Sequence, residues 1–210
     1  MSEIYIVAGP PRSGTSVTAG ILHALGVNMG VGGFMLNNAT DEWNLKGHFA
    51  DREFHAFTTR YLSGLDRPRD DWEPDHEGSV MIAAMIQSRS SHPKWGIKGL
   101  HSWVAARVLS AMGLDVRLIV CDRPIEQSQA SFQERTFDDF KADAPSFVED
   151  TKVAVESLWN AWPQGKRHRV VYADLFDATE STLQSLADFV GLPLNDEARN
   201  MIDPNGRRFG

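Results

Sequence analysis

The chain has 210 residues, 42% of them apolar and 23% charged, which is the composition of a globular protein, and this length predicts one domain over 1–210. The formal charge of −7 argues against nucleic acid as a general partner, and no run approaches the roughly 20 apolar residues that span a bilayer. Cys121 is the only cysteine, so no internal disulfide is possible, and the first apolar run lacks a basic leader; we therefore expect a cytoplasmic protein.

The first half of the chain opens with a strand, a turn and a helix. A short β-branched and aromatic run predicts a buried parallel strand over 3–8. Apolar residues at helical spacing predict a helix from Gly14 to Leu25, which Gly26 would cap. Residues 27–50 should form an irregular excursion. The expected elements after it are helices over 51–63 and 79–90, a surface loop over 64–78 and a short strand over 95–98.

The second half repeats the alternation of strands and helices. We expect a strand over 116–121, a helix with Pro124 in its first turn, a helix over 144–162, a strand over 168–172 and a helix over 178–190. This order predicts an α/β fold, a three-layer sandwich around a mostly parallel sheet. Ligands of such sheets bind at the carboxyl ends of the strands.

The segment between the first strand and the first helix has the character of a phosphate-binding loop. It reads Gly9-Pro10-Pro11-Arg12-Ser13-Gly14-Thr15-Ser16. A helix start offers unpaired N–H groups and a positive dipole end, and Arg12 adds a charge. Gly9 and Gly14 have the separation found in nucleoside triphosphatases, but Thr15 stands where their lysine would be. The pattern indicates an anion site, and a plain turn is the alternative.

A second segment could hold a separate phosphate. Arg123 follows the strand over 116–121, and Ser131 lies eight residues further on, about two turns down the next helix. If this helix lies beside a bound nucleotide, the guanidinium and the hydroxyl can converge on one phosphate. Otherwise both are solvated surface groups.

Together the two segments resemble the nucleotide-binding motifs of the sulfotransferases that use 3'-phosphoadenosine 5'-phosphosulfate (PAPS), and the resemblance extends from Ile4 to about Pro193. It implies the P-loop-like fold of that family and a reaction that leaves 3'-phosphoadenosine 5'-phosphate (PAP). It also implies that the 5'-phosphosulfate is held by Arg12, Ser13, Gly14, Thr15 and Ser16, and the 3'-phosphate by Arg123 and Ser131. Tyr172 would lie near the adenine, or else be a core aromatic residue. Arg207 and Arg208 could close over the 3'-phosphate or form a disordered tail.

The resemblance also suggests the reacting groups. Lys98 would stabilise the charge of the departing PAP together with Arg12. The candidate bases are His101, which is one residue out of the family register, Asp51 and His48; Asp51 could instead cap the helix that follows. Ala50 stands where bacterial relatives carry a glutamate. We expect no metal, because no cluster has metal-ligand spacing.

The sequence therefore predicts a PAPS-dependent sulfotransferase. Its acceptor would be a small molecule or carbohydrate with a hydroxyl or amine, bound by residues 27–78. Six of the aromatic residues in that segment could stack on the acceptor: Trp43, Phe49, Phe54, Phe57, Tyr61 and Trp72. Helical spacing makes Phe54, Phe57 and Tyr61 candidates for the core instead. The alternatives are a P-loop nucleotide or small-molecule kinase and a non-catalytic nucleotide-binding module. The oligomeric state is left open.

Overall fold

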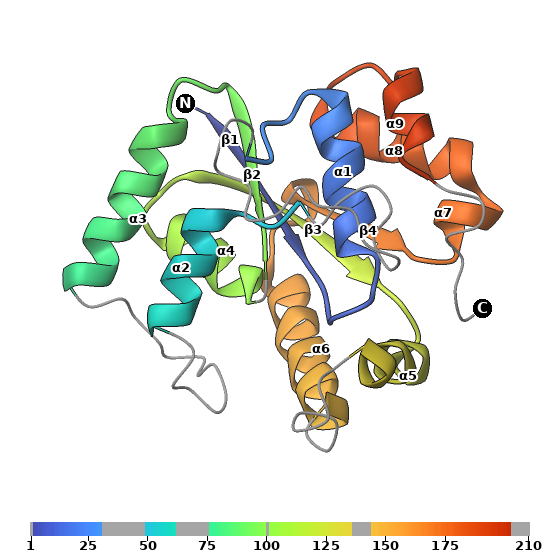
Figure 1. Ribbon diagram of the computed structural model, residues 1–210. Helices are drawn as coiled ribbons and strands as arrows, with labels where there is room; N and C mark the ends of the chain where they lie inside the picture. The colour runs from blue at the N-terminus through green and yellow to red at the C-terminus, as the bar shows by residue number, and fades with distance from the viewer. Residues whose placement is uncertain (1, 31–48, 62–75, 100, 136–143, 203–210) are drawn as a thin grey trace.

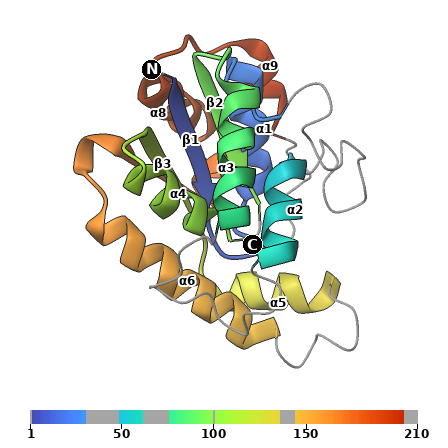
Figure 2. The same ribbon diagram turned by 90° about the vertical axis from the view of Figure 1, so that its left-hand side faces the viewer.

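The computed structural model describes residues 2–30, 49–61, 76–99, 101–135 and 144–202 (Figures 1 and 2). Within these ranges the chain forms one parallel sheet whose strands lie in the order β2-β1-β3-β4. The strands are β1 (Glu3–Ala8), β2 (Lys94–Lys98), β3 (Asp115–Asp122) and β4 (Arg167–Val171). The predicted α/β fold is confirmed, and each expected strand is present within two residues of its predicted bounds.

The described helices are α1 (Thr15–Leu25), α2 (Arg52–Tyr61), α3 (His76–Arg89), α4 (Ser102–Ala111), α5 (Ile125–Arg135), α6 (Ala144–Ala161), α7 (Asp174–Asp177), α8 (Thr179–Val190) and α9 (Asp196–Asn200), with a 3₁₀ turn at Gln164–Lys166. Gly26 and Gly191 end α1 and α8 in the left-handed conformation, as expected from the sequence. The sequence did not predict α4. Its start lacks a capping signal, and His101 at the N-cap makes no side-chain cap.

Alternating side chains of the strands separate two cores. Ile4, Ile6 and Leu118 pack against α2, α3, α4 and α6, whereas Val7 and Ile119 pack against α1, α7, α8 and α9. Figure 1 shows these two groups of helices on opposite sides of the sheet. Burying each branched aliphatic side chain stabilises the fold by roughly 1.5–3 kcal/mol. The expected three-layer sandwich is thus present, and α5 lies outside both layers, beyond the carboxyl ends of the strands.

The strand order predicts a ligand crevice at the carboxyl ends of β1 and β3. The chain leaves β1 for β2 on one side, and then crosses to β3 on the other side of β1. Such a reversal opens a gap between the two connections, where α/β proteins bind their ligands. The β1–α1 loop and the β3–α5 turn both begin there, and Figure 1 shows them at the same edge.

Candidate active site

The β1–α1 loop is a tight turn held by its own backbone. Both the N–H and the hydroxyl of Ser13 donate to the carbonyl oxygen of Pro10, at 3.2 and 2.7 Å. A Cβ on Gly9 would lie 2.5 Å from the Ser13 Oγ and 2.7 Å from the Cys121 carbonyl oxygen. Arg12 and Gly14 adopt left-handed conformations, with φ of 68° and 92°. Ser13 therefore shapes the loop with its donors, and Gly9 allows the loop to pass close to β3.

The start of α1 presents donors that the helix itself cannot use. No side chain caps the helix at Gly14, and its first backbone bond runs from the Thr18 N–H to the Gly14 carbonyl oxygen. The N–H groups of Thr15 and Ser16 precede that bond, so they have no acceptor within the helix. Both residues are only half-buried. This end of α1 therefore has donors available to an anion.

Lys98 brings a cation to this helix start from the neighbouring strand. It ends β2 and lies opposite Val7 of β1 in the parallel register. Its Nζ donates to the Ser16 Oγ at 3.0 Å. The positive charge that Thr15 does not provide is thus supplied by β2. The sequence pointed to Lys98 through its position at a strand end, but not to its contact with Ser16.

Arg12 connects the two predicted phosphate segments. Its Nε donates to the Ser131 Oγ at 3.1 Å, and its carbonyl oxygen accepts from the Arg123 Nη1 at 3.0 Å. The Arg123 side chain is buried, and its Nε donates to the Gln127 Oε1 at 3.2 Å. Gln127 was not among the site residues predicted from the sequence, although its position four residues after Arg123 is a signal for such a pair. Arg123, Arg12 and Ser131 form one connected group at the carboxyl ends of β1 and β3.

The Tyr172 ring contacts both Arg123 and the β1–α1 loop. The Arg123 guanidinium lies over its ring, 4.2 Å from the centroid, which is a cation–π contact. A Cβ on Gly14 would meet the same ring at 2.8 Å. The ring therefore lies between the loop and Arg123; it is half-buried and also packs against the core on the α1 side of the sheet.

The candidate bases have very different surroundings. Asp51 is the N-cap of α2: its Oδ1 accepts from the Phe54 N–H at 2.8 Å, while its Oδ2 accepts from the Arg89 Nη2 at 2.5 Å. Its side chain is fully buried, so the capping alternative is confirmed and both of its carboxylate oxygens have protein partners. His48 lies outside the described residues, as do Arg207 and Arg208.

His101 lies at the start of α4 and is partly buried. It precedes α4, near the carboxyl end of β1, where Ser102 Oγ donates to the Val7 carbonyl oxygen at 2.6 Å. Its Nδ1 is buried and has no hydrogen-bond partner among the described residues, and its ring packs edge-on against Phe147. Burial lowers the pKa of His101 below its ordinary value, which favours the neutral imidazole.

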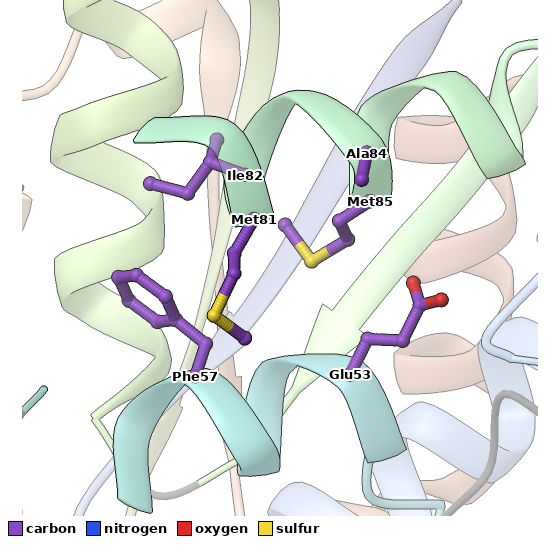
Figure 3. Close-up of a pocket in the computed structure, with 6 residues that line it drawn as sticks. All are labelled: Glu53, Phe57, Met81, Ile82, Ala84 and Met85. Atoms are coloured by element: carbon purple, nitrogen blue, oxygen red, sulfur yellow. The ribbon is translucent and has the colours of Figure 1, made fainter. Parts of the chain in front are cut away.

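An apolar pocket of about 190 Å³ lies between α2 and α3 (Figure 3). Its lining residues project toward one another from the two helices: Glu53, Phe57, Met81, Ile82, Ala84 and Met85. The Glu53 carboxylate pairs with Arg89. Phe54 and Phe57 belong to the core, as their helical spacing predicted. Phe49 is buried as well, whereas Trp43, Trp72 and the side chain of Tyr61 lie outside the described residues.

Two kinds of feature are absent from the described residues. They contain no group of three or more His, Cys, Asp or Glu side chains arranged to hold a metal ion. In the same ranges, no helix combines the length and the hydropathy needed to cross a bilayer.

The arrangement defines a class: a parallel α/β sandwich with a Gly-Pro loop before its first helix and a basic group at its strand-order reversal. Solved structures with this fold include the sulfotransferase domain of the Synechococcus PCC 7002 olefin synthase, with a TM-score of 0.60 and 15% identity over 97% of this chain and 78% of that chain. Sulfotransferase STF1 from Mycobacterium tuberculosis H37Rv matches with a TM-score of 0.56 and 17% identity over 96% of this chain and 70% of that chain.

The sulfotransferase domain from the curacin biosynthetic pathway also matches, with a TM-score of 0.56 and 13% identity over 97% of this chain and 78% of that chain. No protein-family model matches the sequence, and no curated protein matches it significantly. The chain therefore has the fold of the sulfotransferases, as the two motifs had predicted.

Proposed function

We propose that this protein is a PAPS-dependent sulfotransferase, which moves a sulfuryl group to a hydroxyl or amine of a small-molecule or carbohydrate acceptor. The observation that carries the proposal is the connected group of Arg123, Arg12 and Ser131 beside the uncapped start of α1. It brings two separate anion-binding elements into one crevice. A nucleotide with a phosphate at each end of its ribose needs such an arrangement.

The contacts suggest how PAPS would lie. The N–H groups at the start of α1, the Thr15 and Ser16 hydroxyls and Arg12 would hold the 5'-phosphosulfate, with Ser13 shaping the loop. Arg123 and Ser131 would hold the 3'-phosphate. Tyr172 contacts both Gly14 and Arg123, so its ring is suitably placed to pack against the adenosine between the two phosphates.

The reaction would be an in-line displacement at sulfur. The acceptor oxygen or nitrogen forms a bond to sulfur while the bond from sulfur to the 5'-phosphate oxygen breaks, and PAP leaves with the electron pair. Lys98 and Arg12 would stabilise the charge that develops on this oxygen. His101 would take the proton of the acceptor, because burial keeps its imidazole neutral near neutral pH.

Thermal unfolding with different nucleotides tests the proposal. PAP at a hundred times its dissociation constant should stabilise the protein by about 2.7 kcal/mol, which corresponds to a rise of roughly 5–10 °C in Tm. AMP, which lacks the 3'-phosphate, should stabilise it less. A response to ATP with magnesium but not to PAP would contradict the proposal and favour the kinase. PAP binding without transfer to any acceptor would favour the non-catalytic module.

The 3'-phosphate assignment predicts a selective loss of affinity. Arg123→Ala should weaken PAP binding by about 10- to 100-fold, since a charge-assisted contact is worth about 1.5–3 kcal/mol, and should leave AMP binding nearly unchanged. Titration calorimetry with both ligands measures the difference. Ser131→Ala should act in the same direction, and Ser185→Ala, at an exposed serine of α8, is the matched control. Equal losses for PAP and AMP would contradict the assignment.

The pH dependence of turnover tests His101. Its lowered pKa means that the neutral imidazole persists below pH 6.5, so kcat should fall on the acid side only as the pH drops through this lowered value. His101→Asn should lower kcat by about 10²-fold and remove this acid limb. Asparagine tolerates the left-handed backbone at this position, where φ is 62°.

His168→Asn is the matched control for this measurement. Burial also lowers the pKa of His168, but this residue lies on β4, where its ring stacks on Phe189 on the side of the sheet opposite α4. The acid limb should persist in this variant. If it also persists in His101→Asn, another group takes the proton.

The kinase alternative would need a carboxylate that can bind magnesium. Asp122 ends β3, where a magnesium-binding kinase carboxylate could lie, but its oxygens pair with Lys152 at 3.4 Å and with Arg169 at 3.2 Å. This pairing disfavours the kinase.

We place the enzyme in the cytoplasm, because the one cysteine, Cys121, is buried and cannot form an internal disulfide.

A further inference from the structure

The Arg12 side chain reaches from the β1–α1 loop to α5. Its Nε donates to the Ser131 Oγ at 3.1 Å, although the two residues are 119 positions apart in the sequence. The backbone of Arg12 is left-handed, with φ of 68°, which residues other than glycine rarely adopt and which is often retained at functional sites. The loop thus directs Arg12 to a residue proposed for the 3'-phosphate, whereas its place in the motif implies only the 5'-phosphosulfate.

Arg123 contacts the same loop residue. Its Nη1 donates to the Arg12 carbonyl oxygen at 3.0 Å, and its side chain is buried. Two guanidinium groups and the Ser131 hydroxyl therefore belong to one set of contacts. Like charges repel each other, and burial lowers the pKa of Arg123 because it disfavours the charged form. An anion with more than one negative charge would offset both effects.

The donors of this group match the acceptors of a phosphate. A guanidinium carries five N–H donors, and the contact with Ser131 uses one of those of Arg12. Ser131 accepts this bond with a lone pair, so its own O–H can donate to an anion. Arginine also binds phosphate oxygens in pairs, with a fixed geometry that lysine lacks. A phosphate dianion has three terminal oxygens, which Arg12, Arg123 and Ser131 can share.

We propose that Arg12 takes part in both phosphate sites of the donor, and that its guanidinium binds the 3'-phosphate together with Arg123 and Ser131. Arg12 is thereby a specificity-determining residue. It distinguishes a nucleotide with phosphate at both positions from nucleotides such as AMP or ATP, which carry phosphate only at the 5' position. This inference rests on the proposed use of PAPS, and it assigns to Arg12 a contact that the motif does not imply.

PAP and its two halves separate the contributions of the two phosphates. AMP has only the 5'-phosphate, and adenosine 3'-monophosphate has only the 3'-phosphate. Arg12→Gln should weaken the binding of each half about tenfold and the binding of PAP about 100-fold, because PAP loses both contacts. The variant retains the backbone carbonyl that Arg123 contacts. Titration calorimetry measures the three dissociation constants, with competition against PAP for the two weaker ligands.

A double-variant cycle tests whether the contact with Ser131 carries the effect. Ser131→Ala removes the acceptor of the Arg12 Nε. In the double variant, the loss of affinity for adenosine 3'-monophosphate should therefore be smaller than the product of the two single losses. Arg199→Gln is the matched control. Arg199 lies on α9, where the Asn195 amide donates to the Ala24 carbonyl oxygen near the end of α1, so this variant should change none of the three constants.

Two results would overturn the inference, and they differ in what they say about the proposed function. In the first, Arg12→Gln weakens AMP and PAP binding by the same factor and leaves the binding of adenosine 3'-monophosphate unchanged. Arg12 then contacts the 5' end alone, and the proposed function stands. In the second, the unmodified protein binds neither PAP nor adenosine 3'-monophosphate, and the proposed function fails together with the inference.

Discussion

Arg89→Met is expected to destabilise the protein by about 3–5 kcal/mol. Arg89 is 1% exposed and pairs with the fully buried Asp51 at 2.5 Å, while its Nη1 also donates to the Met85 carbonyl oxygen at 3.0 Å. Methionine fills the space but leaves the Asp51 carboxylate buried without its counter-charge. Because Asp51 also caps α2 and its N–H donates to the Lys98 carbonyl oxygen, the loss should reach the edge of the active site. Urea unfolding measures the change.

The loss of stability in Arg89→Met should depend on pH, because the substitution changes the pKa of Asp51. Burial raises the pKa of Asp51, and the charge of Arg89 acts against that rise. Without Arg89, the folded state binds a proton more readily than the unfolded state does, so the variant loses stability as the pH rises above the ordinary carboxyl pKa. The stability gap between the unmodified protein and the variant should therefore be smaller at about pH 5 than at about pH 8.

Arg199→Met is the matched control for the buried pair. Arg199 pairs with Glu180 and Asp196 at the surface, where solvent screens the charges, so the same substitution should have little effect. Equal losses in the two variants would contradict the role given to Arg89. Asp51→Asn distinguishes a structural role of Asp51 from a catalytic one. It should lower stability in either case. A decrease in kcat that remains after correction for the folded fraction would mean that Asp51 is itself the base.

Lys98→Ala is expected to lower kcat by about 10²- to 10³-fold while changing the dissociation constant of PAP much less. The Lys98 Nζ contacts Ser16 at the helix start that would hold the 5'-phosphosulfate, so its charge lies where the leaving group gains charge. An interaction that strengthens only in the transition state lowers kcat when it is removed. The rate of PAP formation from PAPS measures the effect with any acceptor that supports turnover.

Two further variants serve as comparisons for Lys98→Ala. Lys166→Ala removes an equal charge from an exposed pair with Asp115, next to β4 at the other end of the strands, and should leave kcat unchanged. Ser16→Ala removes the partner of Lys98 but keeps its charge, so the loss should be smaller. If Lys98→Ala instead weakens PAP binding and leaves kcat intact, Lys98 holds the nucleotide and does not act in the transition state.

Much of the fold was predictable because its signals are local. The apolar run of β1, the Gly-Pro turn and the helical spacing up to Leu25 all report on neighbours within a few residues. The sequence missed α4, whose N-cap has no capping side chain, and therefore also the surroundings of His101. The capping role of Asp51 was visible as an alternative, but the burial that comes with Arg89, 38 residues away, was not.

By itself the sequence determined which segments could bind anions: a helix start rich in small residues after β1, and an arginine followed two turns later by a serine after β3. Only the tertiary structure decided that they meet at one edge of the sheet. The order β2-β1-β3 places Arg123 against the carbonyl oxygen of Arg12, 111 residues away, and the β1–β2 register brings Lys98 to Ser16, 82 residues away. The physical reason is that helix and turn preferences act over a few residues, whereas strand order and register depend on how the two cores are buried.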